Sequence, residues 1–120
     1  MRDLLASDTP EAAQAVDMFC DRAAQQVAVL ATMLGGLDAV VFTAGIGERS
    51  AAIRAGISRR LAWLGAELDE TANAAGEAKI DTSSSKLGLW IVPTDEESMI
   101  ARHSRALLAG RAHGRRTTTA

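Results

Sequence analysis

The stretch that decides the fold lies between residues 38 and 48 and runs Asp38-Ala39-Val40-Val41-Phe42-Thr43-Ala44-Gly45-Ile46-Gly47-Glu48. Its first half is a short apolar run rich in β-branched residues, which predicts a central strand over 38–43, buried on both faces. Residues 44–50 predict a loop. The apolar period of the residues that follow predicts a helix ended by Gly65. This order of elements is typical of an α/β protein.

The segment before this strand predicts a long helix from Pro10 to about Leu34. Thr9 suits the N-cap, and Pro10 suits the first helical position because its missing N–H has no helical partner there. Gly35 suits the left-handed C-cap. Apolar residues recur at three- and four-residue steps, so we expect one buried stripe made of Val16, Phe19, Cys20, Ala23, Val27, Leu30 and Leu34.

The second half of the chain predicts another strand over 87–92, ended by Pro93. Residues 69–73 suggest a turn of helix, and 79–82 are compatible with a short third strand. Thr94 and Glu97 have the spacing of a capping box at the start of a last helix. That helix is expected to fade near Gly110 and to turn one face inward, formed by Met99, Ile100, His103 and Leu107.

Composition bounds the class of protein. The chain has 120 residues, of which 48% are apolar and 23% charged, so it forms one globular unit at most. A net charge of -2 argues against a nucleic-acid partner, and no apolar run is long enough to cross a membrane. The start at Met1 lacks the apolar stretch of a secretory signal, so a cytoplasmic location is expected. Cys20 is the single cysteine, which excludes an internal disulfide.

Two or three strands are fewer than the four to six that a sheet usually has, so we expect the sheet to be completed by chain absent from this sequence. The core is filled mainly by small side chains, and association with a partner surface is expected for the same reason. Residues 111–120 are polar and without period, which predicts a disordered tail.

Two motifs are candidates for chemistry. Gly45 and Gly47 have no Cβ and would let a ligand approach the backbone, although a plain tight turn has the same pattern. Carboxylates at residues 95–97 follow a strand and could hold Mg²⁺. Helix capping explains Glu97 and the helix dipole explains Asp95, which leaves Glu96 as the metal-ligand candidate.

Taken in order, three segments resemble the acetate and propionate kinase family: Met1 to Leu4, Leu34 to Glu48, and Val92 to Arg102. The resemblance extends to about Leu108. It implies a partial ATPase domain of the actin, hexokinase and Hsp70 type, ribonuclease H-like, with an incomplete sheet. Residues 1–110 would be the C-terminal portion of that domain, and 111–120 the disordered tail.

The resemblance also implies a function and a site. Family members are cytoplasmic homodimers that move the γ-phosphoryl of ATP to acetate, reversibly, with Mg²⁺. The family's adenosine-binding residues map onto Met1, Arg2, Gly45, Ile46, Gly47, Glu48 and Arg49. Its Mg²⁺-linked glutamate maps onto Glu96. Arg49 and Asp95 each replace an asparagine that is usual in the family.

The family's phosphate motif, substrate arginines, histidine and catalytic aspartate have no counterpart in this sequence, so no catalytic residue is assigned and the chain alone is expected to be inactive. The acyl pocket is missing too, so acetate is not distinguished from propionate or butyrate. Two alternatives stay open. One is a noncatalytic dimerisation or nucleotide-binding remnant; the other is a sugar kinase relative, which the Pro-Thr-Asp-Glu-Glu segment disfavours.

Overall fold

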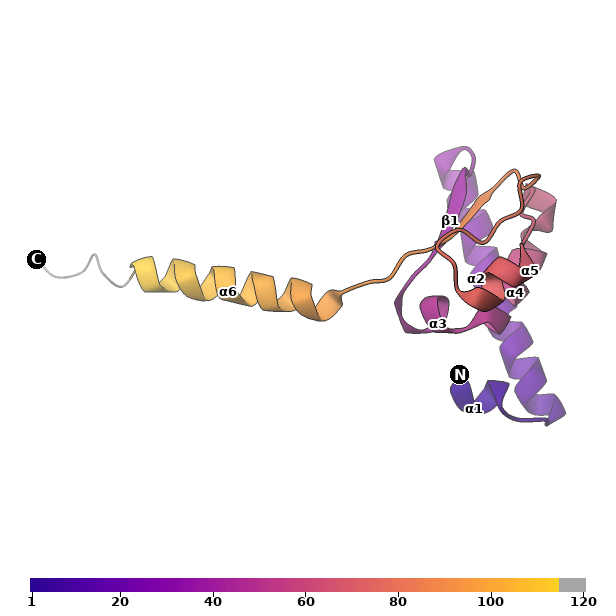
Figure 1. The fold of residues 1–120 in the computed structure, drawn as a ribbon, viewed down its shortest axis with the longest axis horizontal. Coiled ribbons are helices and arrows are strands. Elements are labelled where there is room, and N and C mark those ends of the chain that lie inside the picture. Colours follow the sequence, from indigo (N-terminus) through magenta and orange to yellow (C-terminus); the bar gives the residue numbers. More distant parts are fainter. Residues whose placement is uncertain (115–120) are drawn as a thin grey trace, which may run out of the picture.

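The computed structural model describes residues 1–114 and has two parts of different character (Figure 1). Residues 1–95 form a body in which a small parallel sheet lies among helices. The last helix, α6 (Glu96–Gly114), stands away from this body. The radius of gyration is therefore 20.3 Å, well above the value of about 13 Å for a compact chain of 100 residues.

Helix α2 (Pro10–Leu34) begins and ends as its sequence predicts. The Thr9 side chain accepts a hydrogen bond from the backbone N–H of Ala12, and Gly35 closes the helix in the left-handed conformation, at φ 76°. The buried stripe is confirmed only in part: Cys20 is buried, whereas Leu30 and Leu34 are 54% and 74% exposed. One side of the C-terminal turns is covered, since Ala31 is 7% exposed, whereas Leu30 and Leu34 lie on a side that the described residues leave uncovered.

Strands β1 (Ala39–Phe42) and β2 (Gly88–Ile91) pair in parallel, with Ala39 opposite Gly88. The expectation that β1 is covered on both faces is wrong for residues 1–114, because Val41 is 53% exposed. Residues 79–82 do not form a strand; two isolated bridges, Leu68 with Asp81 and Lys79 with Trp90, hold that segment.

Residues 44–50 are not a loop, contrary to expectation. Residues Ala44–Arg49 form the short helix α3, which is followed at once by α4 (Ala51–Arg60). The Ser50 side chain caps α4 by accepting from the N–H of Ile53. A single 3₁₀ turn, η1 (Ala62–Leu64), ends at the left-handed Gly65, and α5 (Glu70–Ala75) follows with Asp69 as its N-cap. Because only Ser50 separates the two helices, the position of α4 constrains the direction of α3.

The core lies between α2, α4 and the inner face of the sheet. Close packing at its centre depends on Gly56, because a Cβ there would lie 2.7 Å from the Cys20 Sγ. Cys20 is thus a small core residue, as expected, and burial raises the pKa of its thiol. The largest side chains that are almost fully buried belong to Ile53, Leu61, Ile80 and Leu89.

The start and course of α6 differ from the sequence prediction. The helix is not opened by a Thr94 capping box: the Asp95 side chain accepts from the N–H of Ser98 at 3.1 Å, while Thr94 bonds elsewhere. The expected inward face is exposed, with Ile100 at 66% and Leu107 at 71%. The helix continues past Gly110 to Gly114. The rest of the expected tail, 115–120, lies outside the described residues.

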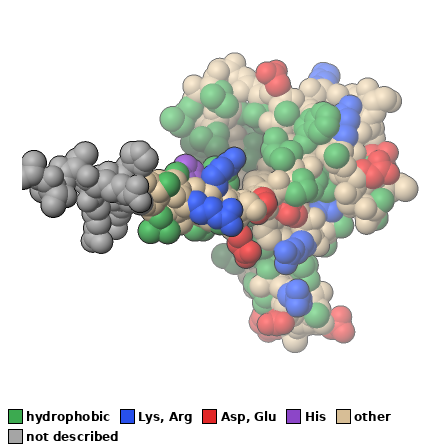
Figure 2. All heavy atoms as spheres, turned by 60° about the vertical axis from the view of Figure 1, so that its left-hand side comes forward, with side chains coloured by type: hydrophobic (Ala, Val, Ile, Leu, Met, Phe, Trp, Pro, Cys, Tyr) green, Lys and Arg blue, Asp and Glu red, His purple; other side chains and the backbone are tan. Residues whose placement is uncertain are grey.

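Apolar side chains consequently reach the surface both on the body and along α6 (Figure 2). Trp63 is 71% exposed and Met33 78%. Among the helices of residues 1–114, none combines the length and the apolar character that a membrane span needs.

Candidate nucleotide site

The carboxyl ends of β1 and β2 lie together because the strands are parallel, and both predicted motifs leave the sheet at that end. The Thr43 hydroxyl donates to the carbonyl of Val92 at 2.8 Å, which ties the two chain segments where they leave the sheet. This edge of an open α/β sheet is the usual place for a ligand. The topology thus brings the glycine segment beside the acidic segment.

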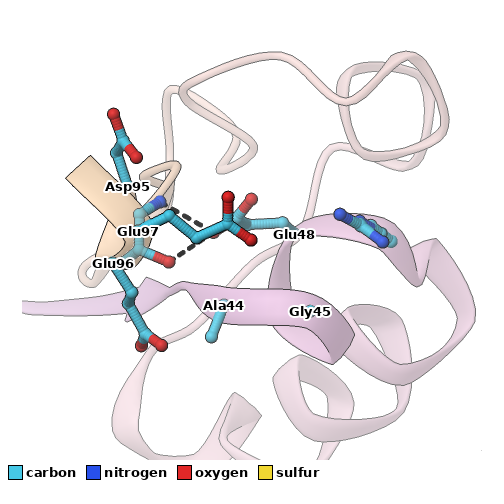
Figure 3. A pocket seen from close by; sticks show the side chains of 8 residues that line it. Ala44, Gly45, Glu48, Asp95, Glu96 and Glu97 are labelled. Carbon is cyan, nitrogen blue, oxygen red and sulfur yellow. Dashed lines mark hydrogen bonds between the residues drawn. The ribbon is translucent and has the colours of Figure 1, made fainter. Parts of the chain in front are cut away.

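A cavity of about 340 Å³ opens between the two segments (Figure 3). We call it the acidic cavity; its lining is Ala44, Gly45, Glu48, Arg49, Thr94, Asp95, Glu96 and Glu97. Four of these residues were not among the predicted site residues: Ala44, Thr94, Asp95 and Glu97. Thr94 was assigned to helix capping instead, and its place after the second strand is the signal that pointed here.

Glu48 links the two segments directly. Its Oε1 accepts one hydrogen bond from the backbone N–H of Thr94 at 2.8 Å and another from the Thr94 hydroxyl at 3.1 Å. These bonds, the backbone one above all, lower the pKa of the Glu48 carboxyl below its ordinary value of 4.5. The carboxylate is therefore ionised at neutral pH and holds the wall of the acidic cavity together.

A second cavity, also about 340 Å³, lies between α3 and the first residues of the chain. This N-terminal cavity is lined by Met1, Arg2, Leu5, Gly45, Ile46, Arg49 and Ser50. Gly45 and Arg49 line both cavities. Helix α1 (Arg2–Leu5) therefore places the first residues of the chain beside the glycine segment, 40 residues and more away in sequence.

The two predicted glycines differ in what surrounds them. A Cβ built on Gly45 would meet nothing within 4 Å, so this position faces open space. A Cβ on Gly47 would lie 3.2 Å from the carbonyl carbon of Phe42, and Gly47 lines neither cavity. Gly45 thus offers bare backbone to a ligand, whereas Gly47 lets α3 pack closely on the end of β1.

Ala44 adopts a backbone conformation that is costly for its type. Among the described residues, it is the one non-glycine residue with a positive φ, at 58°. The left-handed region costs an alanine about 1–2 kcal/mol. It stands at the first position of α3 and lines the acidic cavity. Strain of this kind gathers at ligand sites.

The acidic residues after β2 have separate surroundings. The hydroxyl of Ser98 and, to a lesser degree, its N–H lower the pKa of the Asp95 carboxyl, which serves as the helix cap. The Asp95 and Glu96 side chains point in opposite directions (Figure 3), and Glu96 is exposed. Across residues 1–114 no three carboxylate, imidazole or thiol groups converge to hold a metal by themselves. One free carboxylate nevertheless suits Mg²⁺, which keeps several waters and takes its other ligands from phosphates.

Comparison with known proteins identifies the family of the chain. The family model described as the acetokinase family matches residues 1–102. The chain is 57% identical over 109 residues to an acetate kinase of Rhizobium meliloti, covering 91% of this chain and 28% of that protein. It is 49% identical over 112 residues to an acetate kinase of Rhodopseudomonas palustris, with 92% and 28% covered.

Solved structures agree as well. A propionate kinase from Francisella tularensis superposes with a TM-score of 0.75 at 38% identity, over 83% of this chain and 26% of that one. An acetate kinase from Entamoeba histolytica gives 0.76 at 28% identity, over 88% and 30%. The chain is thus an α/β unit that has the fold of part of the acetate and propionate kinases. It belongs to the acetokinase family, and it spans about 28% of the length of the curated relatives described.

Proposed function

We propose that this chain supplies the nucleotide-binding wall of an acetate kinase, an enzyme that transfers the γ-phosphoryl of ATP to acetate and yields acetyl phosphate and ADP, reversibly. The single observation that carries the proposal is the meeting of the glycine segment and the acidic segment in one cavity at the carboxyl ends of both strands. The family match over residues 1–102 supports it.

In this proposal the adenosine lies across the outer surface of α3. Gly45 and Ile46 offer backbone and apolar surface, while Met1 and Arg2 close the far side of the N-terminal cavity. Arg49 lines both cavities and can reach a nucleotide in either. Glu48 contributes indirectly, because its Oε1 is already engaged by Thr94. Gly47 contributes through the packing of α3 on Phe42.

Glu96 is the residue proposed to face Mg²⁺ that arrives with the nucleotide. The ion, when bound, neutralises charge on the phosphates, and this chain would add one carboxylate to its ligands. Asp95 lies next to Glu96 and adds negative charge to the same end of α6. We assign no catalytic residue to this chain. Phosphoryl transfer depends on cations placed around the transferred group, and residues for that role are not among those assigned here.

A chimaera tests the proposal. In the acetate kinase of Rhizobium meliloti, the 109-residue match would be replaced by this chain, and acetyl phosphate formation followed with acetate, ATP and Mg²⁺. We expect turnover from the chimaera and none from the chain alone. A folded chimaera that binds no nucleotide would contradict the proposal.

The second candidate is a noncatalytic remnant of the family that associates through its exposed apolar helices. The exposed faces of α2 and α6 favour some apolar partner surface, such as the homodimer that the resemblance implies. Both candidates are compatible with nucleotide binding, so a positive binding result does not separate them. Absence of nucleotide binding would favour the dimerisation remnant. A cytoplasmic location belongs to the same proposal and rests on the family resemblance, whereas acetate is proposed as the acceptor because the curated relatives are acetate kinases.

A further inference from the structure

Arg54 is a buried cation near the proposed nucleotide site. It lies in α4 and is only 2% exposed. Its guanidinium donates to four oxygens: the side-chain and backbone carbonyls of Asn73 at 2.7 and 2.8 Å, and the backbone carbonyls of Gly47 and Glu48 at 2.9 and 2.8 Å. No carboxylate among residues 1–114 pairs with it. Burial lowers its pKa, and the four acceptors compensate for the loss of water.

Two of these acceptors belong to the glycine segment itself. The carbonyls of Gly47 and Glu48 lie in the last turn of α3, where a helix leaves its carbonyl groups without helical partners and carries partial negative charge. One Nη1 atom of Arg54 bonds both carbonyls. The cation therefore closes the C-terminal end of a helix that lines the acidic cavity at both of its ends.

The other two contacts attach the guanidinium to α5. Asn73 accepts from Arg54 through Oδ1 and through its backbone carbonyl, and its own Nδ2 donates to the carbonyl of Ala51 at 2.9 Å. Asn73 is itself 2% exposed. The planar guanidinium of Arg54 thus donates to α5 from one side and to α3 from the other. A lysine ammonium cannot reproduce that arrangement.

We propose that Arg54 is a positioning residue for the nucleotide site: it holds α3 in the orientation that lets Glu48 meet Thr94 and Gly45 face the cavities. Arg54 lines neither cavity, so it acts on a nucleotide only through α3. This inference deepens the proposed function and rests on it for its effect on nucleotide affinity. Its effect on the Glu48 to Thr94 bond is independent of any ligand.

The test compares Arg54→Lys with a matched control, Asn73→Ala, in the 120-residue chain. The control removes the Oδ1 acceptor and the bond to Ala51 but leaves both bonds from Arg54 to α3. The first readout is the ¹H–¹⁵N resonance of the Thr94 amide, with Glu48→Ala as the reference for a broken bond. The second is the affinity for MgADP by calorimetry.

We expect Arg54→Lys to move the Thr94 resonance more than half way toward the Glu48→Ala position and to weaken MgADP binding by about tenfold or more. Asn73→Ala is expected to leave the resonance in place and the affinity within about twofold. A Thr94 resonance unmoved in Arg54→Lys, or equal weakening by both variants, would overturn the inference. If the unmodified chain binds no MgADP, the proposed function fails, and the Thr94 resonance still decides whether Arg54 positions Glu48.

Should Arg54→Lys fail to fold, the unmodified chain provides the test. Proton exchange of the Arg54 guanidinium is expected to be slower than that of the exposed Arg59 by about tenfold or more, because its hydrogens are buried in hydrogen bonds. Equal exchange rates would mean that the clamp on α3 does not exist.

Discussion

Replacing Gly45 by alanine is expected to have opposite effects on folding and on ligand binding. Gly45 lies within α3, and the added methyl group would meet no atom within 4 Å. Alanine restricts the unfolded chain more than glycine does, so Gly45→Ala should raise the free energy of unfolding by about 0.5–1 kcal/mol.

The same methyl group occupies the open space where a nucleotide is proposed to touch bare backbone. A ring displaced outward by even 0.5–1 Å loses about a quarter to a half of each contact energy with the surface below it. Each contact is worth about 0.1–0.2 kcal/mol, so the roughly 30 contacts on one face of a flat base together lose about 1–2 kcal/mol, or about tenfold in affinity for MgADP.

Urea denaturation followed by circular dichroism measures the first effect, and isothermal calorimetry with MgADP measures the second. Gly47→Ala provides the contrast, because its Cβ would press on Phe42 and destabilise the fold. The reasoning is refuted if Gly45→Ala is as stable as expected and binds MgADP as tightly as the unmodified chain.

Three further perturbations test other parts of the structure. Gly56→Ala should destabilise the chain by about 1–3 kcal/mol through overpacking on Cys20, and the double variant with Cys20→Ala should recover most of that loss in urea denaturation. Ala44→Gly should stabilise the folded chain by roughly 0.5–1 kcal/mol, because the relief of left-handed strain exceeds the entropy that glycine adds to the unfolded chain. A melting temperature below that of the unmodified chain would contradict this. The pKa of Glu48 is lower in the folded chain, so its bond to Thr94 adds full stability above the ordinary carboxyl pKa of 4.5. That contribution is lost as the pH falls through the lowered pKa of the folded chain. Thermal melts of the unmodified chain and of Glu48→Gln, compared across pH, check the sign.

Local signals in the sequence predicted the helices and strands well where backbone chemistry decides them. Thr9 with Pro10 at one end of α2 and Gly35 at the other are such signals, and both ends were predicted correctly. Residues 44–49 were not, because two glycines favour a loop by propensity, while packing of Gly47 on Phe42 and capping of α3 by Arg54 favour a helix. Those contacts are tertiary and have no local signature.

Burial was the least predictable feature. Periodicity predicts which residues share a face, yet it does not say whether a partner covers that face. Leu30 and Leu107 keep the helical period and are nonetheless exposed, since the described residues hold nothing that packs on them. The same limit applies to β1, where Val41 has the composition of a central strand and the exposure of an edge strand.

The sequence indicated which two segments could meet at the candidate site, but not how they are connected. Motif spacing placed the glycine segment and residues 94–97 after strands, which is why both line the acidic cavity. The Thr94 hydroxyl satisfied a capping-box pattern equally well, so sequence alone did not favour its bond to Glu48. Arg54 was overlooked, although an arginine flanked by Ile53 and Ile57 on a buried helix face is a signal that something must pair with it.

A titration of the ¹⁵N-labelled 120-residue chain with MgADP tests the central claim most directly. The account predicts resonance changes concentrated at residues 44–49 and 94–97, with the amides of Gly35 and Gly76, which line neither cavity, left in place. Saturating MgADP that moves none of the residues lining the two cavities, or that moves only α2, would contradict it.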